Sequence, residues 1–212
     1  MVPNLTEALR IYSEALQYIK SVGLETEVQW HRDLDFPKFT EADLLREAAW
    51  VILCSGFRES TVRRLFDYIS LCFCDWVSAK EIVEASPACR LAARRVFRNS
   101  AKLDAIVDVA RHIEADGFQV IKKSILGDPI NILQQFSYIG PITALHLAKN
   151  LGCNVAKPDR HLVRLSAEMG FRNASELCYS IGHSIGEAAR VVDVVLWRYL
   201  ADTQWRSMKL GI

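Results

Sequence analysis

The chain has 212 residues, half of them hydrophobic, and a formal net charge of +1. This length allows one compact core, or two lobes that share a cleft, and is short for two independent domains. No apolar run approaches the roughly 20 residues that span a bilayer, and the first residues lack a charged start followed by an apolar stretch. We therefore expect a cytoplasmic protein without a membrane segment or a signal peptide.

The cysteines and histidines give no metal-site pattern. The six cysteines lie mostly in apolar stretches, and none forms a Cys-x-x-Cys pair with a second pair downstream, so we expect reduced thiols. His31, His112, His146 and His183 show no paired ligand spacing, and we expect no catalytic metal. The near-neutral charge excludes a broadly basic surface, so any surface for nucleic acid must be local.

Helix-start signals recur along the whole chain. A residue that can cap a helix is followed three positions later by Glu or Asp, which is the spacing of a capping box. Two further caps precede a proline that suits the first helical position. The pairs are Asn4 with Glu7, Thr40 with Asp43, Ser78 with Glu81, Asn173 with Glu176, Ser184 with Glu187, Ser86 with Pro87, and Asp128 with Pro129.

Between these signals the apolar spacing is helical, and no segment alternates with a period of two. Glycines at 117, 152 and 170 stand where helices should stop. The pattern predicts an all-α fold of about ten short helices, the last from Gly186 to about Thr203. Residues 24 to 39 are the longest stretch predicted to be irregular.

The stretch from 128 to 169 is the most informative. It predicts a helix that ends near Gln135, a short turn over 136–140 and a second helix that begins at Pro141. Gly140 permits a tight turn, and the ring of Pro141 presets the first helical position. Backbone N–H groups at such a helix start favour an anion, so a DNA phosphate could bind here without many basic side chains.

The turn and the residues after it form the pattern Phe-x-x-Ile-Gly-x-x-Thr-Ala from Phe136, with Asp159 nineteen residues beyond Gly140. This pattern resembles the hairpin and catalytic aspartate of helix-hairpin-helix base-excision DNA glycosylases. Residues 48–64 resemble the early helix and turn from which these enzymes push a side chain into the duplex. Residues 98–106 resemble a following barrel helix, so the resemblance covers the region from about 40 to 170.

The resemblance implies two lobes with a cleft between them. Residues 38–150 would form a helical barrel that includes the hairpin, and residues 1–37 with 151–212 would form the second lobe, which carries Asp159. The cleft would hold a flipped nucleotide of double-stranded DNA, and a monomer suits it. The resemblance also implies an association with the nucleoid.

The chain departs from this family at three places. Tyr138 stands where members commonly have glycine, so the turn geometry can differ. Members that also cleave the strand carry a lysine two residues after the glycine that matches Gly140, and here that residue is Ile142. The resemblance therefore implies a monofunctional enzyme that uses water. No cysteine follows Cys178, so the iron–sulfur cluster of larger members is missing.

Asp159 is the candidate catalytic residue. Cleavage of an N-glycosidic bond builds positive charge on the sugar, which a buried carboxylate stabilises while it orients or deprotonates water. The plainer interpretation is an N-cap, because Asp159 follows a proline and precedes a helix predicted to begin at about Arg160. The hairpin upstream favours catalysis, and both roles can hold at once.

The predicted DNA contacts lie around the hairpin, around Asp159 and at the turn that carries Phe57 and Arg58. We expect no cofactor, except that the hairpin could hold a monovalent cation. Phe57 and Arg58 are alternatives for the wedge that fills the gap left by a flipped base; Phe57 could equally belong to the core. Glu47 and Trp50 could line the base pocket, although packing is the commoner role for such a tryptophan. The DNA-binding set is Ile139, Gly140, Ile142, Thr143, Lys157, Arg160, His161, Phe57 and Arg58.

Two other charged features stand out. Arg90, Arg94, Arg95, Arg98 and Lys102 lie in a run without acidic residues, which could contact phosphate but is more typical of a solvated helix face. In the last predicted helix, Asp193 lies among valines, so its carboxylate should be paired or functional, with a structural ion pair to Arg190 or Arg198 as the default.

The sequence thus predicts a monofunctional DNA glycosylase that flips a damaged or modified base and hydrolyses its glycosidic bond. One alternative is a glycosylase that attacks modified bases of viral DNA as a defence. Another is a DNA-binding module that keeps the hairpin without chemistry, and a third is a helical scaffold with no nucleic-acid role. Base choice depends on the shape of a pocket, which one sequence does not show.

Overall fold

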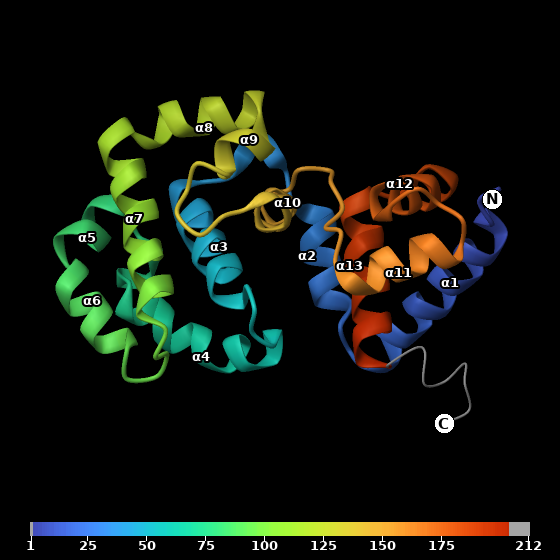
Figure 1. The fold of residues 1–212 in the computed structure, drawn as a ribbon, viewed down its shortest axis with the longest axis horizontal. Helices are drawn as coiled ribbons and strands as arrows, with labels where there is room; N and C mark the ends of the chain where they lie inside the picture. Colours follow the sequence, from blue (N-terminus) through green and yellow to red (C-terminus); the bar gives the residue numbers. More distant parts are fainter. Residues whose placement is uncertain (1, 204–212) are drawn as a thin grey trace. The chain divides into compact units, whose positions relative to one another are not determined.

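The computed structural model describes residues 2–203. In this range the chain forms thirteen α-helices, two short 3-10 helices and no strand (Figure 1). The all-α prediction is confirmed, but the expected number of helices is too low. Short helices such as Ala79–Glu84 and Pro129–Leu133 stand apart from their neighbours because a new cap begins each one. None of the helices described is both long and apolar enough to cross a membrane.

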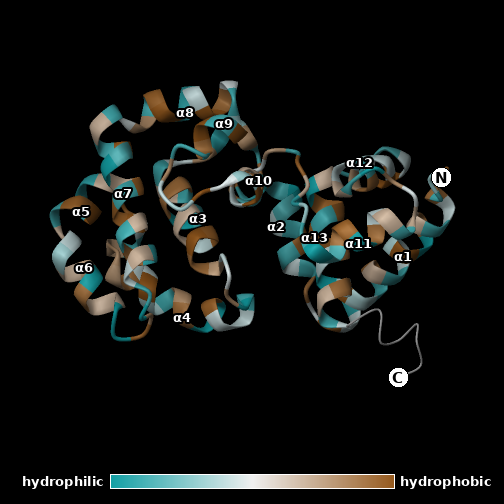
Figure 2. Cartoon of the chain, viewed as in Figure 1, coloured by the Kyte–Doolittle hydropathy of each residue, from teal (hydrophilic) through white to brown (hydrophobic). Residues whose placement is uncertain are grey.

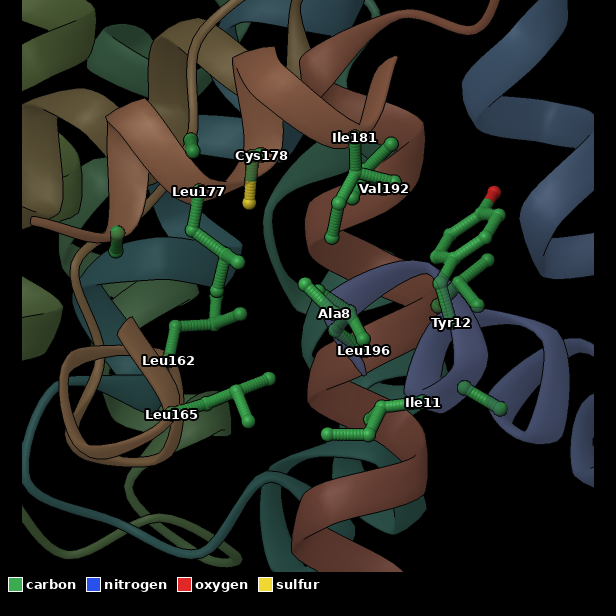
Figure 3. Close-up of a cluster of buried hydrophobic side chains, with 14 of the residues drawn as sticks. Ala8, Ile11, Tyr12, Leu162, Leu165, Leu177, Cys178, Ile181, Val192 and Leu196 are labelled. Atoms are coloured by element: carbon green, nitrogen blue, oxygen red, sulfur yellow. The ribbon is translucent and has the colours of Figure 1, made fainter. Parts of the chain in front are cut away.

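The chain divides into two compact units, with residues up to Leu34 and from Gly152 onward in unit 1 and Asp35–Leu151 in unit 2. In unit 1, α13 packs against all four other helices. Its apolar core gathers side chains from α1, α11, α12 and α13, which point toward one another in Figure 3. The helices of unit 1 are α1 (Leu5–Ser21), α2 (Glu25–Asp33), α11 (Arg160–Glu168), α12 (Ala174–Ile185) and α13 (Ala189–Asp202).

Unit 2 is built around α3 and α7, which pack on each other, while α10 packs on α3 and on α9. Single helices such as α7 carry both hydrophobic and hydrophilic residues, and the apolar ones are buried (Figure 2). The elements of unit 2 are η1 (Phe36–Lys38), α3 (Glu41–Cys54), α4 (Glu59–Cys72), η2 (Cys74–Trp76), α5 (Ala79–Glu84), α6 (Ser86–Ala93), α7 (Ser100–Asp116), α8 (Phe118–Gly127), α9 (Pro129–Leu133) and α10 (Pro141–Asn150).

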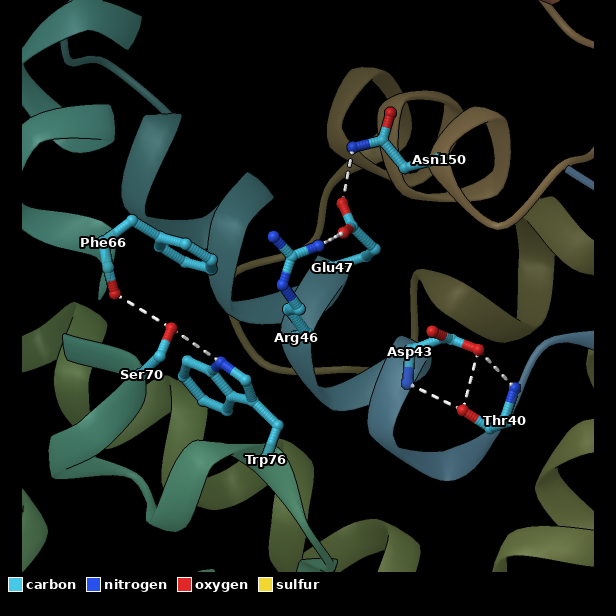
Figure 4. A network of polar contacts seen from close by, with 8 residues as sticks. All are labelled: Thr40, Asp43, Arg46, Glu47, Phe66, Ser70, Trp76 and Asn150. Carbon is cyan, nitrogen blue, oxygen red and sulfur yellow. Dashed lines mark hydrogen bonds and ion pairs between the residues drawn. The ribbon is translucent and has the colours of Figure 1, made fainter. Parts of the chain in front are cut away.

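Most of the predicted caps hold. Thr40 and Asp43 form a complete capping box, since the Asp43 N–H donates to Thr40 Oγ1 at 3.1 Å and the Thr40 N–H to Asp43 Oδ2 at 2.8 Å (Figure 4). Ser86 is the first residue of α6 rather than its cap. The side chains that cap as predicted are those of Asn4, Thr40, Ser78, Asp128 and Asn173.

The predicted cap at Ser184 is wrong. Ser184 lies inside α12, where its hydroxyl donates to the Ser180 carbonyl at 2.9 Å. Gly186, expected to begin the last helix, instead ends α12 with φ of 71°, a left-handed conformation that glycine adopts without steric strain. The last helix therefore begins at Ala189.

The stretch from 24 to 39 is also not irregular, because it contains α2 and η1. Only Val28 and His31 of α2 are buried, and no side chain caps its start. The helix therefore lacks both the apolar repeat and the cap on which a sequence-based prediction depends.

Candidate functional site

The hairpin lies in unit 2, where α9 packs on α10. Phe136 and Ile139 are buried at the base of the turn, and the Ile139 N–H donates to the Phe136 carbonyl at 3.2 Å. Any contact of Ile139 with DNA would therefore go through its backbone. The second helix begins at Pro141, as predicted, with Gly140 as its N-cap.

The start of α10 presents unused backbone donors. No side chain caps this helix, and Pro141 has no N–H, so the N–H groups of Ile142 and Thr143 in the first turn are left for an external acceptor. Gly140 and Pro141 are exposed, and Ile142 is 53% exposed. Backbone donors and the helix dipole together favour an anion at this place.

Asp159 is the N-cap of α11 in unit 1. Its Oδ1 accepts the N–H groups of His161 and Leu162, each at 2.9 Å. In the described part of the chain no protein donor bonds its Oδ2, so this oxygen is left for an outside partner. The predicted capping role is therefore present, and it uses only one of the two carboxylate oxygens.

The loop that carries Asp159 is fixed from behind by Asp193 of α13. Asp193 is only 1% exposed, and its Oδ2 accepts the Lys157 N–H at 2.6 Å. The Asp159 N–H donates in turn to the Lys157 carbonyl at 2.8 Å. Asp193 is therefore joined to Asp159 through one residue of backbone.

Two further donors, one from a side chain and one from the backbone, hold the same loop at Asn154. The Tyr179 hydroxyl of α12 donates to the Asn154 carbonyl, and the Arg190 N–H at the start of α13 donates to Asn154 Oδ1 at 3.3 Å. The Arg190 side chain donates to the carbonyls of His31 and Leu34, each at 2.9 Å. The loop is thus bonded to α12 through Tyr179 and to α13 through Arg190.

Arg198, also on α13, makes a bidentate pair with Glu27 of α2 at 2.6 and 2.7 Å.

The other residues predicted next to Asp159 gather at the start of α11. Arg160 is exposed, whereas Lys157 and His161 are half-buried. Burial lowers the pKa of His161, and the neighbouring positive charges of Arg160 and Arg164 lower it further, against the opposing effect of Asp159. Arg160 Nε donates to His161 Nε2 at 3.2 Å, as suits a neutral imidazole.

The proposed wedge lies in the turn between α3 and α4. Phe57 is 44% exposed, and its ring lies 5.1 Å from that of the buried Phe97, so it belongs partly to the core and partly to the surface. Arg58 is exposed at the N-cap of α4.

Lys102 corrects the expectation of a solvated basic face. It is 3% exposed, and its ammonium group donates to the carbonyls of Ile52, Leu53 and Ser55 at the end of α3. Burial lowers the pKa of Lys102. Of the same run, Arg90 pairs with Asp104 at 3.0 Å, while Arg94, Arg95 and Arg98 are exposed.

Glu47 and Trp50 on α3 are held by neighbours in unit 2. Glu47 is 5% exposed, and its two oxygens accept from Arg46 and from Asn150 of α10, each at 2.8 Å (Figure 4). Burial raises the pKa of this carboxyl. The ring of Trp50 contacts Phe66 edge-on at 5.0 Å, with the Arg63 guanidinium 5.4 Å from its centroid. Because the Glu47 side chain is buried, little of it is accessible to a base edge.

Sequence reasoning missed two residues of this region. The charge run predicts a solvated position for Lys102, as for the arginines beside it, because depth within the fold is not visible in a charge run. Tyr138 was noted only as a departure from glycine, although it has φ of 68° and is 49% exposed. Tyr138 belongs to the turn of the hairpin, and Lys102 contacts the rings of both Tyr138 and Phe57.

No protein-family model matches the sequence, and neither does any curated protein. Two solved structures share the fold. One is the 8-oxoguanine DNA glycosylase of Thermotoga maritima, with a TM-score of 0.64 and 20% identity over 92% of this chain and 97% of that one. The other is the Methanocaldococcus jannaschii 8-oxoguanine glycosylase/lyase in complex with a 15mer DNA containing 8-oxoguanine, with a TM-score of 0.59 and 18% identity over the same shares. The chain therefore has a DNA glycosylase fold.

Proposed function

We propose that this chain is a monofunctional DNA glycosylase, which flips a damaged or modified base out of duplex DNA and hydrolyses its N-glycosidic bond. Asp159 carries the proposal. It is fixed at the start of α11 by two backbone N–H groups, in a chain with the fold of two DNA glycosylases. The uncapped start of α10 supplies backbone donors for a DNA phosphate.

Asp159 would act through its second oxygen. Positive charge develops on the sugar as the bond between C1′ and the base nitrogen breaks, and a carboxylate next to the sugar stabilises it. A water molecule oriented by Oδ2 adds its oxygen to C1′ and gives a proton to Asp159. The base leaves with the electron pair of the broken bond and takes a proton from solvent.

The absence of lyase chemistry is supported by two side chains. Ile142 stands where the resemblance would require a nucleophilic lysine. The buried Lys102 is unsuited to replace it, because its ammonium group is 3% exposed and held by three backbone carbonyls, so it is not presented at the surface where a sugar could reach it. An abasic site, rather than a nicked strand, would be the product.

The first base to test is 8-oxoguanine, because both structural neighbours carry it in their names. Base release would be measured on duplexes that each carry one oxidised, deaminated, alkylated or hypermodified base, with alkali treatment to convert abasic sites to breaks. We expect release by the native chain without breaks before alkali, and no product trapped by borohydride.

The decisive variant is Asp159→Asn. Asparagine is an equally good N-cap, so the fold should be kept, while base release falls at least about a hundredfold. Asp67→Asn, which removes an exposed carboxylate from α4, is the control and should release base at the native rate. Equal release by native chain and Asp159→Asn would refute the role of Asp159.

The same panel separates the rival functions. Release only from hypermodified bases would indicate defence against viral DNA. Tight binding of every duplex without release would indicate a binding module, in which Asp159 serves only as the cap of α11. No binding even at low salt, where phosphate contacts are strongest, would exclude a role with DNA.

A further inference from the structure

Two exposed aromatic rings from distant parts of the sequence lie against one buried ammonium group. Lys102 Nζ is 4.9 Å from the ring centroid of Phe57 and 5.8 Å from that of Tyr138. Phe57 comes from the turn between α3 and α4, and Tyr138 from the turn of the hairpin. The two turns therefore meet at Lys102.

Lys102 is well suited to fix this meeting point. Its side chain extends from α7, and its three carbonyl acceptors lie at the end of α3, directly before the turn that carries Phe57. The ammonium group thereby binds the last carbonyls of that helix. Its charge also attracts the faces of both rings.

Tyr138 adopts a backbone conformation that favours glycine. Its φ of 68° lies in the left-handed region, where the Cβ of an L-residue is crowded. Glycine would make the same turn without strain. Because the turn would accept glycine and the side chain is half exposed, this strain is a reason to ask what the ring of Tyr138 binds.

Exposed aromatic rings beside phosphate-binding donors suit one kind of ligand. Every nucleobase has a flat face that can stack on an aromatic ring, so such stacking does not depend on the sequence of the strand. The exposed start of α10 at Pro141 follows Tyr138 by three residues, so a strand whose phosphate binds there would pass close to the ring. Base flipping also leaves unstacked faces in the duplex, which need such a partner.

We propose that Tyr138 and Phe57 form a stacking site for a nucleobase exposed by flipping, and that Lys102 positions both rings. Tyr138 is thus a DNA-contacting residue in its own right. The proposal rests on the proposed function in one respect only, namely that duplex DNA binds at the hairpin.

The test measures binding rather than base release. The probe is a duplex with a stable abasic analogue and 2-aminopurine opposite it, compared with the intact duplex. Stacking of Tyr138 or Phe57 on the 2-aminopurine should change its fluorescence when the protein binds. Tyr138→Gly should weaken binding of the abasic duplex by roughly ten- to a hundredfold and abolish that change. Binding of the intact duplex should change much less.

Three controls keep the result interpretable. Tyr138→Gly should melt no lower than the native chain, because glycine accepts the left-handed turn. Tyr138→Phe keeps the ring and should bind as the native chain does, whereas Tyr68→Ala removes an equally exposed ring from α4 and should change nothing. If Tyr138→Phe behaved like Tyr138→Gly, the hydroxyl rather than stacking would be responsible, and the proposal would be wrong.

The outcomes separate this inference from the proposed function. A native chain that binds the abasic duplex and excises a base, with Tyr138→Gly indistinguishable from it, would overturn the stacking site alone. A native chain that binds neither duplex would overturn both. Loss of binding by Tyr138→Gly while Asp159→Asn still binds would support the stacking site whatever base is excised.

Discussion

The loop that carries Asp159 and the turn of the hairpin are held in opposite ways. The loop is bonded to the buried carboxylate of Asp193 at Lys157, and to Tyr179 and Arg190 at Asn154. The hairpin turn instead exposes a strained tyrosine and leads into a helix start that no side chain caps. In the loop, the Lys157 N–H, the Asp159 N–H and the Asn154 carbonyl are bonded within the protein, whereas the N–H groups at the start of α10 have no side-chain cap.

This difference matches what each region would do. A group that takes part in a reaction must stay within a fraction of an ångström of its working position, which requires support from residues behind it. A surface that receives DNA needs unused donors and exposed rings, which a fully bonded turn would lack. The following three predictions test whether the two regions are separable, in order of decreasing expected effect.

Lys102→Met should cause the largest loss of stability. The carbonyls of Ile52, Leu53 and Ser55 would lose a charged donor, and we expect the free energy of unfolding to fall by about 2–4 kcal/mol. Urea unfolding measures this loss. Lys80→Met removes an exposed lysine that lies 3.9 Å from Glu84, and should change stability by less than about 0.5 kcal/mol. Equal effects of the two variants would show that the Lys102 contacts are dispensable.

Asp193→Leu should act on the other region. It leaves the Lys157 N–H without its acceptor and should lower the free energy of unfolding by about 1–3 kcal/mol. Because the Asp159 loop would lose its support, single-turnover base release should fall roughly tenfold, while the dissociation constant for DNA should change less than that, through the DNA contacts predicted at Lys157 and Arg160. Asp193→Asn keeps an acceptor oxygen, so its stability and its rate of base release should lie between those of the native chain and Asp193→Leu. If Asp193→Leu released base at the native rate, the loop would not need this contact.

The smallest effect concerns pH. Because folding lowers the pKa of His161 below its ordinary value of 6.5, the unfolded chain binds the proton more readily. The stability that the neutral ring contributes is present above pH 6.5 and is lost as the pH falls through the lowered folded pKa. The urea midpoint of the native chain should therefore drop more between pH 8 and pH 5.5 than that of His161→Asn. Parallel drops in the two proteins would refute this assignment.

Local signals in the sequence predicted much of the fold. Thr40 and Asp43, or Asn173 and Glu176, interact across a single turn, so three-residue spacing is enough to find them. Ser184 and Glu187 have the same spacing but fail, because the left-handed Gly186 between them ends one helix instead of beginning another. Helix α2 was missed since its packing, rather than its own repeat, makes it helical.

The candidate site was predictable where it depends on sequence spacing and not where it depends on depth. Gly140, Pro141 and Asp159 lie at the helix starts that their residue types predicted. Asp193 was correctly suspected of having a partner, but its contact with the Lys157 N–H joins residues from different helices and loops. Lys102 looked like one more surface charge, and only packing of α7 on α3 shows otherwise.

The uncapped start of α10 has a consequence for how such a protein would search a genome. Backbone N–H groups and a helix dipole offer only about half an elementary charge to a phosphate, and the whole chain has a net charge of +1. The predicted DNA-binding set adds only three cationic side chains, Arg58, Lys157 and Arg160, so few counterions would be released on ordinary duplex and binding there should be weak and brief. We expect such a protein to dissociate and rebind at distant sites rather than slide far along the duplex. It would stay longer only where an unstacked base can also contact the stacking site proposed at Tyr138 and Phe57.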